Sequence, residues 1–410
     1  MVCTLESHRA ELNELLGPVF AALGTELLDI NSPVLADRVT SEDIFATLPI
    51  PAFTNSQMDG YAARSTDLAS ASVSIPVILP LGYTAAAGDP QISLVPGTVS
   101  PVMTGAMIPE GADTVIPVER SVAGAFPQLV RVGHGIPTGE ASFSAPSAAG
   151  QFIRPLGEDL AAGALVAAAG TRLTPTMIAA LASSGLQQIP VHRSLRVALC
   201  TTGDELGGDT TVQGQIPDAN SPMLAAWLRH YGVYVRTLQL PDDPARFTQA
   251  IDQLQTQVDL VLTVGGISAG AYEVVRQSLA PRGGNFHHVA MQPGGPQGFA
   301  RLEQCAVLCF PGNPVSALLS AELFLAPLLR QLNRLPEPQP ESYPLAAGVN
   351  SPANKHQVRR ALIREGRVTV LDPGSHLVHD LAHADALVHI PVGVSELSAG
   401  QIINTWRLNV

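Results

Sequence analysis

Hydrophobic residues are spaced differently in successive parts of this 410-residue chain. In residues 5–23 leucine and valine recur at helical spacing, which predicts an amphipathic helix. From about residue 66 to residue 146, short runs of Val, Ile, Leu and Ser are separated by Gly and Pro, a pattern typical of a small β-rich module. Residues 150–190 pass from a turn-rich stretch into an alanine-rich helix, which has Pro175 in its first turn and Gly185 after its end.

Residues 195–333 show another pattern, in which short apolar runs alternate with amphipathic ones. The predicted strands are LRVALC, YVRTLQL, VDLVLTVGG and CAVLCF, and SPMLAAWLRHYG and DPARFTQAIDQL are predicted helices between them. This alternation favours a mostly parallel sheet that is covered by helices on both faces. The loops that follow the carboxyl ends of such strands are expected to meet at one crevice.

The chain is too long for one typical domain, and the pattern predicts an α/β protein of four. Residues 1–60 and 147–192 are expected to form a discontinuous helical N-terminal and linker domain, because the β-rich module of residues 61–146 is inserted into it. Residues 193–335 are expected to form a three-layer α/β/α domain. After a proline-rich linker, residues 341–410 are expected to form a C-terminal domain resembling a β-barrel.

Charge and composition narrow the possible partners. The formal net charge of −12 argues against sequence-independent binding of nucleic acid. Lys355 is the only lysine among 23 basic residues, so an anionic ligand must be held by arginine, backbone N–H groups, helix N-termini or a metal. No apolar run reaches membrane-spanning length and the N-terminus has no apolar signal core, so we expect a cytoplasmic protein without a membrane partner. The four cysteines are expected to act as small buried hydrophobic residues.

Polar and glycine-rich segments follow the predicted strands of the α/β domain. Each could be an ordinary helix cap or tight turn. Together they combine free backbone N–H groups for phosphate with carboxylates for a divalent cation, which indicates a site for a phosphorylated ligand. Neither the P-loop pattern nor G-x-G-x-x-G is present. The residues of these segments are Thr202, Gly203, Glu205, Asp242, Gly265, Gly266, Ser268, Glu273, Pro311, Gly312, Asn313 and Pro314.

Three of these segments, TTGDEL, VGGISAG and FPGNPVSA, resemble in this order the molybdopterin-binding fold of the MoeA and gephyrin E-domain family. NSQMDGYA, PVMTGAMIPEGADTVI, IRPLGEDLAAGALV and PGSHLVHDLAHADALVHIP are similar to further parts of the family, so the resemblance covers roughly residues 10–410. It implies the insertion of molybdate into adenylylated molybdopterin with Mg²⁺-dependent release of AMP. It also implies a homodimer, in which each cleft lies between the α/β domain of one subunit and the β-rich module of the other, and a molybdopterin adenylyltransferase as a partner.

The resemblance also implies roles for individual residues. Asp59, Glu205, Asp242 and Glu273 would surround metal and pyrophosphate, as catalytic groups and as Mg²⁺ ligands. Mg²⁺ usually takes only one or two protein carboxylates, and which of the four is a ligand and which orients water stays open. Pro311 and Pro314 would shape the turn beside the pterin or molybdate pocket. Further family site positions are Thr104, Arg154, Asp159 and Ser375.

The sequence departs from the family in the segment QPGGP, where Gln292 and Gly295 replace two lysines. Each lost ammonium group removes charge-assisted hydrogen bonds worth about 1.5–3 kcal/mol. Arg276, Arg282 and Arg301 are candidates to replace them. The alternative is an impaired paralogue that binds molybdopterin or acts as a scaffold. Glu273, where the family usually has Asp, is a milder change.

The segment SHLVHDLAHAD contains His376, His379 and His383 at positions i, i+3 and i+7. On a helix these side chains would share one face, as in a transition-metal site. Without matching acidic or cysteine partners, we expect them to be surface or cap histidines.

Overall fold

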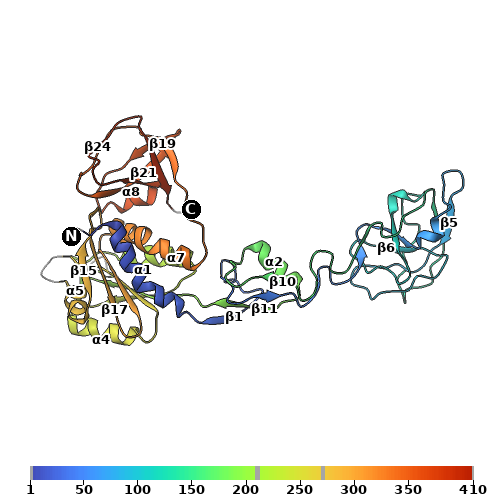
Figure 1. The fold of residues 1–410 in the computed structure, drawn as a ribbon, viewed down its shortest axis with the longest axis horizontal. Helices are drawn as coiled ribbons and strands as arrows, with labels where there is room; N and C mark the ends of the chain where they lie inside the picture. Colours follow the sequence, from blue (N-terminus) through green and yellow to red (C-terminus); the bar gives the residue numbers. More distant parts are fainter. Residues whose placement is uncertain (1–2, 208–212, 269–272, 409–410) are drawn as a thin grey trace.

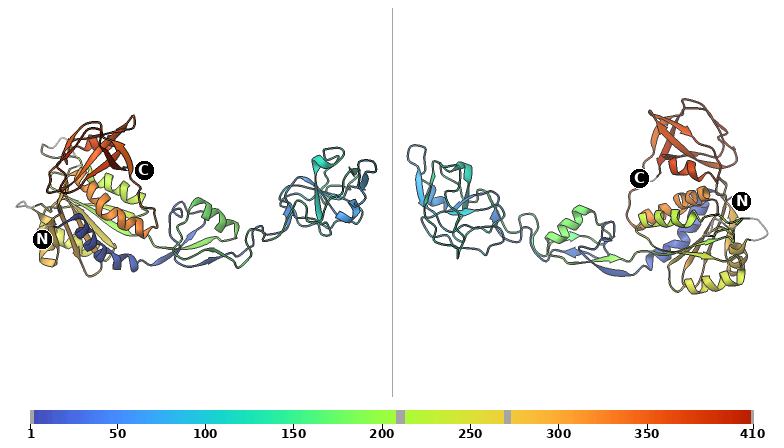
Figure 2. Two further views of the ribbon diagram at one scale, coloured as in Figure 1. Left: turned by 45° about the horizontal axis from the view of Figure 1, so that its top comes forward. Right: turned by 180° about the vertical axis from the view of Figure 1, so that it is seen from behind.

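The computed structural model describes residues 3–207, 213–268 and 273–408. The chain is elongated, with two lobes packed together at one end, a narrow connection, and a separate lobe at the far end (Figure 1). Both termini lie at the two-lobed end, as the two further views also show (Figure 2). The chain therefore runs out from helix α1 (Leu5–Ala21) to the far lobe and returns to the sheet of the α/β lobe.

A six-stranded sheet forms the centre of the α/β lobe. Its strand order is β13-β12-β14-β18-β17-β15, in which β13, β12, β14 and β18 are parallel and β17 and β15 are antiparallel. The central strands are buried on both faces, which explains their almost continuous apolar sequences. The strands are β12 (Arg196–Thr202), β13 (Tyr234–Leu240), β14 (Leu260–Val264), β15 (Asn285–His288), β17 (Pro296–Arg301) and β18 (Ala306–Phe310).

Helices cover both faces of this sheet. Alternate residues of β12 belong to different cores: Val197 packs with α1, α3, α6 and α7, whereas Ala198 packs with α4 and α5. The predicted multidomain α/β fold with a mostly parallel sheet is confirmed. Its helical segments are α3 (Asn220–His230), α4 (Pro244–Leu254), α5 (Val274–Leu279), η3 (Ala280–Arg282), α6 (Pro314–Ser320), η4 (Ala321–Leu325) and α7 (Ala326–Leu332). Cys200, Cys305 and Cys309 are buried, as expected, but Cys3 is only partly buried.

Segments α6, η4 and α7 form one helix of 19 residues, Pro314–Leu332. Its length and composition would suffice to cross a membrane, whereas the sequence pattern predicts no apolar run of that length. However, 72% of the most apolar 18-residue stretch of this helix is buried inside the protein. It is therefore a core helix of the α/β lobe.

The C-terminal lobe has its own β-sheet and core. The hydrogen-bonded order is β16-β21-β23-β25-β19, with β22 beside β21. A bridge between Leu345 and Val368 links the end of β19 back to β22, so the strands surround the core of this lobe. The elements are β16 (Met291–Gln292), β19 (Glu341–Pro344), β20 (Val349–Asn350), β21 (His356–Arg364), β22 (Arg367–Val370), α8 (Val378–His383), β23 (Ala386–Ile390), β24 (Glu396–Leu397) and β25 (Ile402–Arg407).

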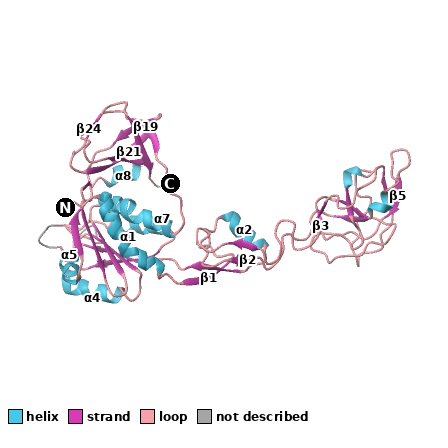
Figure 3. Cartoon of the chain, viewed as in Figure 1, coloured by secondary structure: helices cyan, strands magenta, loops and turns pink. Residues whose placement is uncertain are grey.

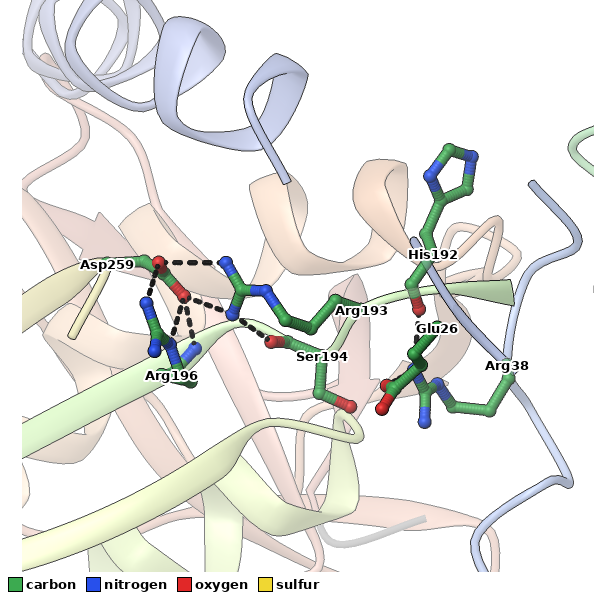
Figure 4. Close-up of polar contacts among 7 residues, drawn as sticks. All are labelled: Glu26, Arg38, His192, Arg193, Ser194, Arg196 and Asp259. Carbon is green, nitrogen blue, oxygen red and sulfur yellow. Dashed lines mark hydrogen bonds and ion pairs between the residues drawn. The ribbon is translucent and has the colours of Figure 1, made fainter. Parts of the chain in front are cut away.

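The connection consists of short strand pairs and one helix, with a small core of its own. Its elements are β1 (Thr25–Asp29), β2 (Ile44–Phe45), β10 (Leu165–Ala167), α2 (Pro175–Ser183) and β11 (Gln188–His192). Polar contacts attach it to the α/β lobe (Figure 4). Asp259 accepts hydrogen bonds from Arg193 at 2.8 and 3.0 Å and from the backbone N–H of Arg196 at 2.8 Å. These contacts hold the returning strand against the start of β14.

The far lobe is built from short strands and loops (Figure 3). β3 pairs with β9, and Phe152 and Ile153 pack on its core, so this lobe extends beyond the predicted limits of 61–146 on both sides. Its elements are β3 (Asn55–Ser56), β4 (Gly60–Ala63), η1 (Ser65–Leu68), β5 (Val77–Pro80), β6 (Ser100–Val102), β7 (Thr114–Pro117), η2 (Val118–Arg120), β8 (Glu140–Phe143) and β9 (Ile153–Arg154).

Candidate active site

A cavity of about 720 Å³ lies at the carboxyl ends of β12, β14 and β18. The three loops that follow these strands, and the loop after β13, converge there as the parallel sheet requires. Twelve of the predicted site residues line the cavity: Thr202, Gly203, Glu205, Asp242, Gly265, Gly266, Ser268, Glu273, Pro311, Gly312, Asn313 and Pro314.

Glycine is needed where the turns of this cavity approach one another. Gly265 and Gly266 have φ values of +98° and +66°, which side chains rarely adopt. A Cβ atom on Gly312 would lie 3.3 Å from the Cα of Gly265, and one on Gly266 would lie 2.8 Å from a side-chain carbon of Val275. The turns can therefore present backbone N–H groups to a ligand at close range.

Two buried polar atoms at the cavity accept or donate no hydrogen bond within the described part of the chain. They are the hydroxyl Oγ1 of Thr202 and the amide Oδ1 of Asn220. Asn220 is held in place by its other amide atom, Nδ2, which donates to the carbonyl of Gly312 at 2.7 Å. Buried polar atoms without partners are costly, so these two atoms favour a polar ligand in the cavity.

The carboxylates of the cavity are close enough to influence one another. Burial raises the pKa of Asp242, and the negative charges of Asp204, Glu205 and Glu273 raise it further. The backbone N–H of Asp204 donates to Asp242 at 3.1 Å and offsets part of this rise. Glu273 accepts hydrogen bonds from both the backbone N–H and the hydroxyl of Ser268. A hard divalent cation would relieve the repulsion among these oxygens, so the donor set fits Mg²⁺.

No arginine or lysine is among the described residues that line the cavity. The three arginines proposed as replacements are engaged elsewhere: Arg301 donates to the carbonyl of Leu15 at 2.6 Å, Arg282 pairs with Asp252, and Arg276 lies over the ring of Phe286. The expectation that they replace the family lysines is therefore not supported by their contacts.

The two positions without lysine differ in their surroundings. Gln292 lies on β16 and accepts a hydrogen bond from Gln357 at 3.2 Å. A Cβ atom on Gly295 would lie 2.3 Å from the ring nitrogen Nε2 of His288. The imidazole of His288 thus occupies the space that a side chain at position 295 would need.

His376 is exposed, as expected, and it also lines the cavity. It precedes α8, so it does not share a helical face with His379 and His383, whose rings lie 4.5 Å apart on that helix. Ser375 is not among the lining residues, although its carbonyl accepts a hydrogen bond from Val315 in the first turn of α6. Sequence reasoning missed His376 and Asn220 as cavity residues, because only the fold brings them to the strand ends.

The remaining predicted site residues lie away from this cavity in the chain. Asp59 and Thr104 are exposed in the far lobe, where Asp59 accepts hydrogen bonds from the backbone N–H of Thr104 at 2.6 Å and from its hydroxyl at 2.7 Å. Both bonds lower the pKa of Asp59. Arg154 and Asp159 border a separate hollow with Ile50 and Pro51. A single chain therefore does not unite all the predicted site residues.

Fold and cavity together define a multidomain α/β protein whose ligand site lies at the strand ends and is formed by acidic residues and glycine-containing turns. The chain belongs to the MoeA family. Models of the MoeA N-terminal region (domain I and II), the probable molybdopterin binding domain and the MoeA C-terminal region (domain IV) match residues 3–185, 198–331 and 342–408.

Similar proteins carry consistent names. Molybdopterin molybdenumtransferase 2 of Mycobacterium tuberculosis is 39% identical over 386 residues, which covers 90% of this chain and 92% of that protein. Molybdopterin molybdenumtransferase of Haemophilus influenzae is 31% identical and covers 99% of this chain and 98% of that protein. The solved structure of the molybdopterin biosynthesis MoeA protein of Pyrococcus horikoshii has a TM-score of 0.78 at 27% identity and covers 99% of both chains.

Proposed function

We propose that this chain is a molybdopterin molybdenumtransferase, which inserts molybdate into adenylylated molybdopterin with Mg²⁺-dependent release of AMP. The observation that carries the proposal is the cavity at the strand ends, which brings together carboxylates, close glycine turns and two buried polar atoms that have no partner among the described residues. The relatives that cover nine-tenths or more of the chain, and are named for this activity, support it.

Each part of the cavity has a task in this reaction. The turns would offer the backbone N–H groups of Gly266 and Gly312 to the phosphates of the substrate, whereas the N–H of Gly265 donates to the carbonyl of Phe310 at 3.0 Å. Glu205 and Asp242 are proposed to hold Mg²⁺, which would neutralise charge on the phosphate oxygens. Glu273, fixed through both of its oxygens by Ser268, is proposed to orient the incoming oxyanion or water. Thr202 and Asn220 would donate and accept hydrogen bonds to the ligand through their unpartnered atoms.

The far lobe is proposed to complete the site of a second subunit. Asp59, Thr104, Arg154 and Asp159 lie away from the cavity of their own chain, on the other side of the connection. In a homodimer, the far lobe of one subunit would reach the cavity of the other. Arg154 would then supply a cation that the described lining of the cavity lacks.

The protein is proposed to work in the cytoplasm and to receive adenylylated molybdopterin from a molybdopterin adenylyltransferase. A direct transfer would protect the labile anhydride from water. Co-purification of the two proteins would support this step, whereas unchanged turnover rates with and without the adenylyltransferase at low substrate concentration would contradict it.

The deciding experiment is an insertion assay on the purified chain. Adenylylated molybdopterin, Mg²⁺ and molybdate are supplied, and the release of AMP and the formation of cofactor are followed together. We expect turnover that depends on Mg²⁺ and that falls at least about a hundredfold in Asp242→Asn. Ligand binding without any turnover would instead identify a paralogue that only binds molybdopterin, and would sink the proposal.

A further inference from the structure

A cluster of four chemically distinct side chains lies outside the cavity, where α1 meets the edge strand β15. Cys3 lies in the N-terminal segment before α1. His8 and Glu11 lie about one turn apart on α1, and His287 lies on β15. One ligand atom of each residue lies within 4.8 Å of the corresponding atoms of the other three. Nothing in the proposed reaction uses these residues.

The distances within the cluster match a metal polyhedron. Nδ1 of His8 lies 2.9 Å from Nε2 of His287, and Oε2 of Glu11 lies 3.5 Å from each of these nitrogens. Two ligand nitrogens that are each about 2.1 Å from a tetrahedral zinc ion lie roughly 3.4 Å apart. The three atoms therefore form a triangle close to one face of a zinc tetrahedron. The sulfur of Cys3 lies within 4.8 Å of all three and can serve as the fourth ligand.

Hydrogen bonding alone does not account for the cluster. The two imidazoles share one hydrogen bond. The Glu11 side chain is 44% exposed, but its Oε2 atom is buried and accepts no hydrogen bond from the described residues. A buried carboxylate oxygen without a donor is costly, and a cation between it and the two rings would remove that cost. His8 is 1% exposed, so its ring is held inside the protein with Nδ1 directed at His287.

The backbone holds the four residues in place without a metal. The side chain of Thr4 accepts a hydrogen bond from the backbone N–H of Ser7, and the hydroxyl of Ser7 accepts one from the backbone N–H of Thr4, which fixes the start of α1. The carbonyl of Cys3 accepts a hydrogen bond from the N–H of Ala290 at 2.8 Å, which attaches the N-terminal segment beyond the end of β15. His8 and Glu11 are three residues apart on a helix and so share a face.

We propose that Cys3, His8, Glu11 and His287 form a structural site for one divalent transition-metal ion of the zinc type. Two imidazoles, one thiolate and one carboxylate neutralise the ion, and four protein ligands leave no open position for chemistry. The site would fasten the N-terminal segment to the edge of the sheet in the α/β lobe, and none of its four residues is among the described residues that line the reaction cavity.

The test uses the full chain with any affinity tag removed, because a histidine tag binds the same metals. After treatment with a chelator, the protein is titrated with Zn²⁺ and separately with Co²⁺. We expect one equivalent to bind, a visible spectrum of tetrahedral cobalt with a thiolate-to-cobalt band, and a rise of several degrees in the unfolding midpoint with Zn²⁺.

Variants locate the ion. Cys3→Ser should remove the thiolate-to-cobalt band, and His287→Gln should weaken Zn²⁺ binding at least about tenfold. Two matched controls, His288→Gln on the same strand and the double variant His379→Gln/His383→Gln on α8, should leave binding unchanged. Circular dichroism checks that each variant is folded. If His287→Gln does not fold, Cys3→Ser still tests the proposal.

Three results would overturn the proposal. The first is the absence of stoichiometric binding at tens of micromolar Zn²⁺. The second is a cobalt spectrum that Cys3→Ser leaves intact. The third is binding that disappears in the His379→Gln/His383→Gln variant instead.

Discussion

The cavity of the α/β lobe and the polar cluster of the far lobe are built in different ways. Around the cavity, buried parallel strands force four loops together, so the site residues come from segments far apart in the sequence. In the far lobe, Asp59 is held by one neighbour, Thr104, at an exposed turn. The described cavity residues are therefore fixed by the packing of the sheet, whereas Asp59 is oriented by a local contact, and in the proposed dimer it would face the cavity of another subunit.

The comparison predicts that either half of the site is inactive without the other. Asp59→Asn and Asp242→Asn should each reduce turnover at least about a hundredfold. When the two inactive variants are unfolded, mixed and refolded together, half of the dimers should contain one of each. Each mixed dimer then has one intact site, so about a quarter of the wild-type activity should return.

The insertion assay measures this recovery, with each variant refolded alone as the control. A mixture as inactive as its components would mean that each site is formed within one chain or not at all. That outcome would remove the proposed dimer.

The loops of the cavity could be predicted, because the apolar strands β12, β14 and β18 are visible as short hydrophobic runs and parallel strands bring their ends together. Asp59 could not be assigned by this logic. It lies in a turn-rich module without a periodic pattern, and only the family resemblance pointed to it. The antiparallel strands β17 and β15 are also not predicted, because β17 contains Pro296 and Gly298 and β15 is a four-residue strand with one apolar residue, Phe286.

His376 and His287 show a second limit of the sequence. The spacing of His376, His379 and His383 favours a shared helical face, but α8 begins only at Val378, so the first of them lies outside the helix. His287 lies 279 residues after His8 in the sequence, although the two rings are in contact in the structure. Contacts of this kind depend on tertiary structure, which residue spacing does not encode.

In the proposed dimer, the connection must be held firmly so that the far lobe reaches the other subunit, and Asp259 is expected to hold it. Burial raises the pKa of Asp259, but hydrogen bonds from Arg193 and Arg196 outweigh it and leave the pKa lowered. With a side chain only 12% exposed, Asp259→Asn should destabilise the α/β lobe by about 2–3 kcal/mol at pH 7. Urea denaturation followed by far-UV circular dichroism measures this loss.

The effect should depend on pH with a definite sign. A lowered pKa contributes stability above the unfolded-state pKa of about 3.9, and this stability is lost as the pH falls through the folded-state pKa. The difference between wild type and Asp259→Asn should therefore shrink below about pH 4. Asp252→Asn, which removes a more exposed ion pair, is the control and should cost less than about 1 kcal/mol. Equal losses in both variants would show that the Asp259 network has no special role.

Thr104→Val tests how far Asp59 depends on its one neighbour. The variant removes the hydroxyl donor at 2.7 Å and keeps the backbone donor. The pKa of Asp59 should then rise toward its ordinary value, so the acidic limb of the kcat/KM profile should move to higher pH and activity should fall about tenfold. Thr104→Ser retains the hydroxyl and should keep the wild-type profile. An unchanged profile in Thr104→Val would mean that Asp59 is oriented by other groups in the assembled site.

Gln292→Lys should have the smallest effect, although it restores a lysine that the family usually has. The family pattern alone would predict a marked gain in affinity for the anionic substrate. In this fold, however, Gln292 lies on β16 beside β21, bonded to Gln357, and does not line the cavity. An ammonium group there would act on the phosphates only through solvent, so KM should change less than about threefold. Gly295→Lys is a less direct test, because a side chain there would displace the exposed imidazole of His288. A tenfold or larger fall in KM for Gln292→Lys would show that the loop before β17 moves into the cavity when substrate binds. The cavity would then depend on its ligand for part of its shape, and the contrast with the far lobe would be smaller.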